Sequence, residues 1–355
     1  MIPRTTGGAS NMRQALLALL LIGLMVPARA PGQAVSKTGT VAAPFLEIPV
    51  GAPAVAMGSA FVSLANDATS LYWNAAGSAW LTQSELVAIH TTWIADTRFD
   101  YAAFVLPIEG FGAIGANFTS LSMDDMKVTT VEKPEGTGEY FSAGDLALGL
   151  SYAHRLTDRF TIGFNAKFIQ QTIWHENATG FAIDAGTIFR TDLFGGMTIG
   201  ASLSNFGTTM QMSGRDLRQF GILDPTKPGT NSQIPEDVEM DSWDLPLLFQ
   251  LGVSTSPVKS ENYRLTVAVD ALHPNDNTES VNVGGEFAFE DVFFVRAGFN
   301  GLGIAPDVRE GGLSLGVGLS TSSFLSSGTT AKFDYAYRDL GRLAGVHVFS
   351  LGVRF

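Results

Sequence analysis

The chain closes with the stretch Val346-His347-Val348-Phe349-Ser350-Leu351-Gly352-Val353-Arg354-Phe355. Counting back from the terminal aromatic residue, every second position is Val353, Leu351, Phe349 and His347, and the positions between them include Arg354, Gly352 and Ser350. A period of two is that of a β-strand, whose successive side chains point to opposite faces. A largely apolar face opposite a face of small and polar residues fits a strand between lipid and a wet lumen. A strand of a soluble β-sandwich that happens to end the chain is the alternative.

The terminal aromatic residue adds a second signal. A last strand ending in Phe355 resembles the C-terminal signature by which bacterial outer-membrane barrels are recognised for insertion. We therefore expect Phe355 to act as an assembly signal and the barrel-assembly machinery to be a partner.

The composition agrees with a membrane barrel. Only 16% of the 355 residues are charged, against about 25% in a typical soluble protein. Glycine is abundant at 39 and phenylalanine at 25, yet no segment after the N-terminal region offers the roughly 20 uninterrupted apolar residues of a membrane helix. The absence of cysteine excludes disulfides and thiolate metal sites. A net charge of −12 argues against nucleic acid as a partner, since that binding needs a basic surface.

The N-terminus reads as a secretory signal peptide. The apolar run Ala15–Pro27 follows Arg13 and ends in Ala28-Arg29-Ala30, which matches a basic region, a short hydrophobic region and a small-residue cleavage site. We expect residues 1–30 to be removed, with translation starting at Met1 or Met12. A signal anchor would need a longer apolar stretch.

From Glu85 onward the chain divides into alternating segments of the length that a tilted strand needs to cross a bilayer. In one of them Val267 falls on the apolar face and Ala268 on the opposite face. We expect about fourteen strands over residues 85–355, close to 85–94, 98–107, 111–121, 143–154, 159–173, 178–190, 195–205, 245–255, 261–272, 279–289, 291–299, 311–321, 329–338 and 345–355. Single-chain bacterial barrels have an even number of antiparallel strands, and fourteen exceeds what one sandwich usually holds.

The connections between these segments alternate in length. The second, fourth, sixth and tenth are short, whereas the third and seventh, Ser122–Ser142 and Phe206–Asp244, are long. Outer-membrane barrels have short periplasmic turns and long extracellular loops. The pattern predicts an integral outer-membrane protein with both termini in the periplasm. It also places outside the cell two stretches with five carboxylates each, Asp124–Glu139 and Gln233–Asp244.

Residues 31–84 do not fit a strand. Gly51–Trp80 is rich in Ala, Gly and Ser and lacks alternation. We expect a short helix over Val55–Leu71, and a turn or cap from Asn74 to Gly77. A segment of small residues ahead of the first strand most simply folds back into the lumen as a hatch. A periplasmic strap or a partner-docking arm is the alternative.

This segment also carries a family resemblance. The run Met57-Gly58-Ser59-Ala60-Phe61-Val62, followed by Ala65–Asn74 and Ala76-Gly77, resembles the N-terminal signature of the PorV/PorQ family, which is similar to the FadL-type long-chain fatty-acid transporters. The motif residues are Met57, Gly58, Phe61, Asn66, Asp67, Tyr72, Trp73, Asn74 and Gly77. The family turn is usually Asn-Pro-Ala-Gly, and Ala75 stands here in place of the proline. The resemblance implies a fourteen-stranded outer-membrane barrel with an N-terminal hatch.

No catalytic, cofactor or metal site emerges from the sequence. The five histidines lie on separate segments without ligand spacing, and no nucleophile elbow or phosphate loop is present in a fitting context. The inward-facing positions instead carry charges of both signs on neighbouring strands, which predicts ion pairs that fill the lumen. These residues are Lys167, Asp184, Arg190, Arg264, Asp270, Glu286, Arg296, Lys332, Asp334 and Arg338. An ion-selective constriction or a carboxylate-binding site is the functional alternative.

For function, the PorV resemblance implies a non-enzymatic shuttle in type IX protein secretion or surface attachment, with secreted proteins or secretion components as partners. The alternative is a FadL-like passive transporter, whose partners are hydrophobic small molecules. Both use the same barrel in outer-membrane lipid, so the sequence alone leaves the choice open.

Overall fold

The structure is a computed structural model that describes residues 39–221, 233–305, 309, 311–321 and 328–355. The expected signal peptide, residues 1–30, lies outside this part of the chain. Fourteen strands form the wall: β1 (Glu85–Thr92), β2 (Arg98–Ile108), β3 (Gly112–Ser122), β6 (Ala143–Thr157), β7 (Phe160–Ile173), β8 (Glu176–Thr191), β9 (Met197–Gly207), β15 (Leu248–Lys259), β16 (Tyr263–Pro274), β17 (Ser280–Phe289), β18 (Phe293–Leu302), β19 (Leu313–Ser320), β20 (Thr330–Asp339) and β21 (Gly345–Arg354).

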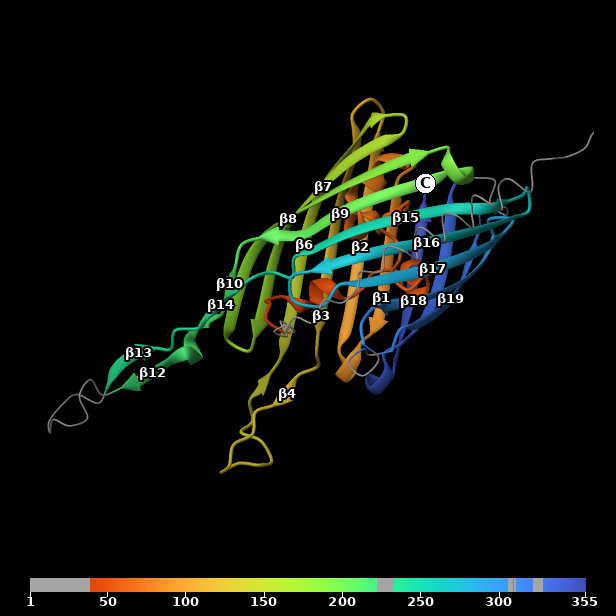
Figure 1. The fold of residues 1–355 in the computed structure, drawn as a ribbon. Coiled ribbons are helices and arrows are strands. Elements are labelled where there is room, and N and C mark those ends of the chain that lie inside the picture. Colours follow the sequence, from red (N-terminus) through yellow and green to blue (C-terminus); the bar gives the residue numbers. More distant parts are fainter. Residues whose placement is uncertain (1–38, 222–232, 306–308, 310, 322–327) are drawn as a thin grey trace, which may run out of the picture.

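Every wall strand pairs antiparallel with its two neighbours, and β1 pairs with β21 to close the barrel (Figure 1). Closure leaves no unpaired sheet edge in the wall, which is the condition for strands to cross a bilayer. The predicted all-β fold of about fourteen antiparallel strands is confirmed. Each predicted strand overlaps an observed one, with ends that differ by a few residues.

Side chains alternate between outside and inside along the wall. In β19 the outward side chains are Leu313, Leu315, Val317 and Leu319, and the inward positions are serines and glycines. Apolar side chains therefore cover the outer surface, the reverse of a soluble protein and the arrangement of a membrane barrel. Among the described residues, no helix is long and apolar enough to cross a membrane.

The two ends of the barrel differ. At one end, here called the long-loop end, the β3–β6 connection contains β4 (Met126–Lys127) and β5 (Tyr140–Phe141). The β9–β15 connection at the same end contains β10 (Met210–Gln211), β11 (Ser213–Gly214), η5 (Arg215–Leu217), β12 (Arg218–Gly221), β13 (Ile234–Asp237) and β14 (Ser242–Trp243). The β12–β13 hairpin and the β4 region project well beyond the wall (Figure 1). Two further one-turn helices lie at this end, η3 (Ile94–Asp96) and η6 (Gly341–Leu343), and η4 (Leu193–Gly195) lies at the opposite, short-turn end.

The segment before β1 folds inside the barrel. It contains η1 (Pro44–Glu47), α2 (Ala52–Ala56), α3 (Ser70–Trp73) and η2 (Ala75–Trp80). We call residues 39–84 the hatch. The expected single helix over Val55–Leu71 is wrong, because α2 ends at Ala56 and both Gly58 and Ser59 have positive φ, at 64° and 63°. A left-handed pair of residues cannot continue a right-handed helix.

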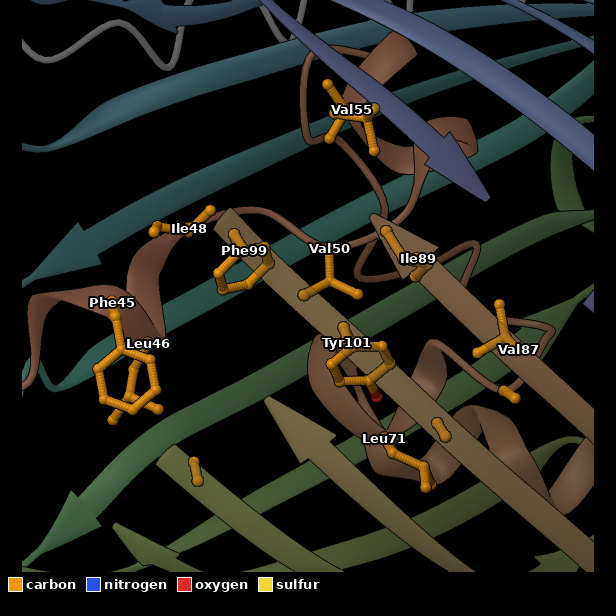
Figure 2. Close-up of a cluster of buried hydrophobic side chains, with 14 of the residues drawn as sticks. Phe45, Leu46, Ile48, Val50, Val55, Leu71, Val87, Ile89, Phe99 and Tyr101 are labelled. Atoms are coloured by element: carbon orange, nitrogen blue, oxygen red, sulfur yellow. The ribbon is translucent and has the colours of Figure 1, made fainter. Parts of the chain in front are cut away.

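The main apolar core lies in the lumen between hatch and wall (Figure 2). Phe45, Leu46, Ile48, Val50, Val55 and Leu71 of the hatch meet Val87 and Ile89 of β1 and Phe99 and Tyr101 of β2. In a water-filled channel, the inward-facing side chains of β1 and β2 would be exposed to water. Packing against the hatch buries them, so the hydrophobic effect holds the hatch in the barrel.

Candidate functional site

The aromatic residues of the hatch motif hold the hatch together. The Trp73 Nε1 donates to the carbonyl oxygen of Val50 at 2.9 Å, and the Tyr72 hydroxyl donates to the carbonyl oxygen of Leu46 at 3.1 Å. The Trp73 ring meets Phe61 edge to face, with centroids 6.1 Å apart. Three parts of the hatch that lie far apart in sequence are thereby tied into one body.

Asn74 joins the hatch to the wall. Its side-chain nitrogen lies 3.1 Å from the Val62 carbonyl oxygen in the hatch, 3.0 Å from the Thr187 carbonyl oxygen of β8 and 3.3 Å from the Ala201 carbonyl oxygen of β9. Its oxygen accepts from the Ala76 amide at 3.2 Å and so caps η2. Asn74 is 1% exposed, and an unpaired amide there would be costly.

The remaining polar motif residues play smaller parts. Asp67 accepts from the Thr69 amide at 2.8 Å and from its hydroxyl at 2.5 Å, which forms a local turn ahead of α3. Asn66 is exposed and makes no hydrogen bond within the described part of the chain. A Cβ on Gly77 would lie 1.9 Å from the Ala65 carbonyl oxygen, so the η2 turn requires glycine there.

Glycines on the inner face of the wall let the hatch backbone approach closely. A Cβ on Gly298 of β18 would lie 2.1 Å from the Gly58 amide nitrogen, and one on Gly284 of β17 would lie 2.3 Å from the Met57 carbonyl oxygen. Conversely, a Cβ on Gly58 would lie 2.5 Å from the Phe299 amide nitrogen. Inward-facing Gly163 and Gly200 meet the hatch backbone in the same way, and Gly186 meets the side chain of Asn74. The hatch is therefore fitted to this wall by shape.

The structure brings five of the predicted lumen charges into one row. Arg296 of β18, whose side chain is fully buried, donates to Glu286 of β17 and to Asp334 of β20, each at 2.7 Å. The Arg296–Asp334 pair spans the intervening strand β19, where Gly318 leaves the space between them. Arg264 of β16 extends the row to Glu286 at 3.5 Å. The Lys332 ammonium lies near this row, 4.6 Å from the centre of the Phe294 ring.

Lys167 and Asp184 form a second cluster, 2.8 Å apart. Asp184 also accepts from the Asn165 side chain at 3.1 Å and from the Asn205 amide at 2.7 Å, where β9 bulges against β8. Asn165 in turn donates to the Leu71 carbonyl oxygen of the hatch at 3.2 Å. The inward-facing asparagines of this cluster are missing from the predicted site residues, although the same alternation of the strands reveals them.

Asp270 stands apart from the ion pairs. Its carboxylate accepts from the Phe61 and Val62 amides of the hatch, at 2.7 and 2.9 Å. It is 0% exposed. The sequence predicts that Asp270 forms an ion pair with a base on a neighbouring strand. In the structure it instead accepts hydrogen bonds from backbone amides of the hatch.

The C-terminus lies at the seam between the first and last strands. Arg354 pairs with Glu85 at 2.8 Å, and the Phe355 amide donates to the Ser84 carbonyl oxygen at 2.9 Å. The Phe355 ring is exposed on the outer face and stacks against Phe104 of β2, with centroids 6.5 Å apart.

Above the hatch, towards the long-loop end, lies a cavity of about 170 Å³. Its lining is mixed: apolar side chains such as Leu46, Trp73 and Ile304 supply the larger part of the surface, and Gln250 and Arg338 are among the polar residues. The Glu47 side chain touches solvent inside the lumen, where enclosure by the barrel and, secondarily, the charge of Asp276 raise its pKa to about 7. The space is small, and its walls combine hydrogen-bonding groups with apolar surface.

The long-loop end exposes apolar side chains among acids. Phe220 on β12, Trp243 on β14, and Met126 and Tyr140 on the β4–β5 hairpin are all exposed, at 45–65% of their surface. The described parts of the two predicted acidic stretches lie in the same connections. Exposed aromatic residues amid polar ones are typical of protein-binding surfaces.

Comparison with known proteins gives a family for about half of the chain. The family model described as "Type IX secretion system protein PorV" matches residues 32–209, which cover the hatch and the wall as far as β9. No curated protein matches the chain by sequence.

Solved structures share the fold at low sequence identity. A FadL homologue from Pseudomonas aeruginosa is 13% identical, with a TM-score of 0.51 over 87% of this chain and 98% of that one. The toluene transporter TodX of Pseudomonas putida is 12% identical, with a TM-score of 0.54 over 86% of this chain and 97% of that one. The toluene transporter TbuX of Ralstonia pickettii is 11% identical, with a TM-score of 0.50 over 86% and 97% of the two chains. At this identity the likeness establishes the architecture alone.

Proposed function

The chain belongs to the PorV family of type IX secretion system proteins, and on that premise we propose that it acts in protein secretion or surface attachment as a non-catalytic outer-membrane barrel. Its working surface is the long-loop end, which captures secreted proteins or other components of the secretion system. The barrel is an integral outer-membrane protein, and its hatch is a structural plug. Both chain ends face the periplasm, so that the long loops reach the outside of the cell.

The proposal rests on a difference between the loops, which expose aromatic side chains, and the lumen, which is filled. The loops present exposed aromatic side chains on hairpins that extend beyond the membrane-spanning wall (Figure 1). Such anchors contribute most of the binding energy at protein interfaces when they become buried. The lumen, in contrast, is filled by the hatch and its apolar core.

A FadL-like role as a carrier of hydrophobic compounds is the competing function. It requires an apolar pocket between hatch and wall. The cavity above the hatch, of about 170 Å³, combines apolar side chains with the polar groups of Glu47, Gln250 and Arg338. A hydrocarbon bound there would strip water from these polar groups without replacing their hydrogen bonds, which weakens binding.

Partner capture by a loop variant and a matched control tests the proposal. The tagged protein is captured from envelopes of its source organism, after cross-linking, and its co-purifying secreted proteins are quantified by mass spectrometry. The loop variant combines Phe220→Ser and Trp243→Ser; the matched control combines Leu193→Ser and Phe194→Ser, exposed apolar residues at the short-turn end.

We expect the loop variant to lose secreted proteins by at least tenfold, while the control retains them and both remain folded. Uptake of a hydrophobic compound that depends on the hatch, together with unchanged protein capture by the loop variant, would instead support the carrier.

A further inference from the structure

Arg338 lacks the ion pair that three other inward-facing bases make. Lys167, Arg264 and Arg296 each meet a carboxylate within ion-pair distance. Arg338, on the inner face of β20, has no carboxylate at that distance in the described residues. Its Nη2 donates to the Asn300 side-chain oxygen at 2.9 Å, with the Asn300 amide turned so that its nitrogen donates to the Gly312 carbonyl oxygen at 3.0 Å. A guanidinium in such a place lacks the counter-charge that normally offsets its desolvation.

Arg338 also has an unused donor. Its Nε is buried and has no hydrogen-bond partner among the described residues. Such groups are rare in folded proteins, because each one forfeits the free energy of a hydrogen bond to water. The guanidinium lines the cavity above the hatch.

Gln250 of β15 lines the same cavity and is 4% exposed. Its amide makes no hydrogen bond with any residue that the structure describes. Ser280 and Asn282 of β17 line the same space with further polar groups. The other charged groups at the cavity are Lys167, which is paired with Asp184, and Glu47, which makes no ion pair with Arg338 in the described chain. The cavity therefore contains one positive charge without an ion-pair partner, that of Arg338, together with several hydrogen-bond donors, including the Gln250 amide.

We propose that this cavity binds a small oxyanion, held by Arg338 through charge-assisted hydrogen bonds and by the Gln250 amide. A carboxylate or phosphate group fits the planar fork of a guanidinium, which presents two parallel N–H donors. The volume, about 170 Å³, suits a compact group rather than an amphiphile with its tail. This site is independent of the proposed secretion role, since it lies in the lumen and not on the loops.

Ligand-induced stabilisation of the purified full-length protein tests the site. The thermal midpoint is measured in detergent with potassium phosphate, potassium acetate or potassium decanoate, each against potassium chloride at equal ionic strength. A ligand that binds only the folded state raises the midpoint by mass action. We expect phosphate, acetate or both to raise it in a saturable manner, and the arm that does so identifies the chemistry of the group.

Two substitutions make the test specific. Arg338→Gln should lower the apparent affinity at least tenfold, and without ligand its midpoint should stay equal to or above that of the native protein, because removal of an uncompensated charge offsets the lost hydrogen bond to Asn300. Arg155→Gln, an exposed arginine against Trp80, should leave binding unchanged.

Three results would overturn the proposal: no saturable effect of phosphate or acetate, an equal effect in Arg338→Gln, or tighter binding of decanoate than of acetate. A fall in the ligand-free midpoint of Arg338→Gln would instead assign the residue a purely structural role.

Discussion

Individual glycines decide how closely the hatch approaches the wall, and two neighbours on β17 allow a matched test. A Cβ on Gly284 would lie 2.3 Å from the Met57 carbonyl oxygen, whereas one on Gly285 would meet nothing closer than 3.9 Å. We expect Gly284→Val to destabilise the hatched barrel by about 1–3 kcal/mol, the usual cost of overpacking. Gly285→Val should be close to neutral. Urea titration of heat-modifiable mobility on gels compares them, and equal effects would show that the hatch does not seat against β17.

The outward face of β16 allows a test of which side chains face the lipid. Val267 is 38% exposed on the outer surface. Arginine at mid-membrane on a lipid face costs about 2–4 kcal/mol, so Val267→Arg should reduce the folded fraction in outer membranes, with Val267→Leu as the control. Folding of both variants at native yield would contradict the assignment of faces. The adjacent Ala268 is no neutral lumen position, because it packs against Met57 and Ala60 of the hatch.

The raised pKa of Glu47 predicts how the stability of the protein depends on pH. Enclosure in the lumen and the charge of Asp276 raise its pKa from 4.5 to about 7, so the folded protein binds this proton more tightly than the unfolded chain. Protonation of Glu47 therefore contributes its full stabilisation of the folded protein below pH 4.5, and this stabilisation is lost as the pH rises towards 7. In thermal melts between pH 4.5 and 8, the midpoint of Glu47→Gln should fall less with rising pH than that of the native protein. Parallel curves would show that Glu47 titrates normally.

At the scale of elements, the strands follow directly from the alternation of side chains. The period-two pattern predicts each of the fourteen, because lipid on one side and the lumen on the other sort the side chains at every step. The hatch is less predictable. Its sequence is compatible with a helix over Val55–Leu71, but Gly58 and Ser59 adopt positive φ where the chain meets β18. Contact with the wall sets this turn. The wall residues lie far away in the sequence, so no local sequence pattern predicts the turn.

The last strand carries its own prediction. Phe355 stacks on Phe104 and its amide reaches Ser84, so it completes the seam between β21 and the chain ahead of β1. Deleting Phe355 should lower the heat-modifiable, folded fraction in outer membranes several-fold, and Phe355→Tyr should largely retain it. Unchanged folding and yield of the deletion would remove its role as an assembly signal.

At the scale of the whole molecule, the sequence predicts which charges point inward but not how they pair. Arg296 reaches Asp334 across β19, and Asp270 serves the hatch backbone. Pairs between non-adjacent strands depend on barrel curvature and on the hatch, neither of which a strand pattern records. The unpaired Arg338 is visible only after its neighbours are placed.

For the barrel as a whole, we propose that the hatch closes the lumen, so that the protein works through its loops. Planar-bilayer conductance tests it most directly, with the intact protein compared with a variant lacking residues 51–80 and both checked for heat-modifiable folding. The closed wall of hydrogen-bonded strands should let the shortened chain fold. We expect almost no steady conductance for the intact protein and a large open-pore conductance for the variant. Strong conductance of the intact protein, or an equally sealed barrel without residues 51–80, would contradict it.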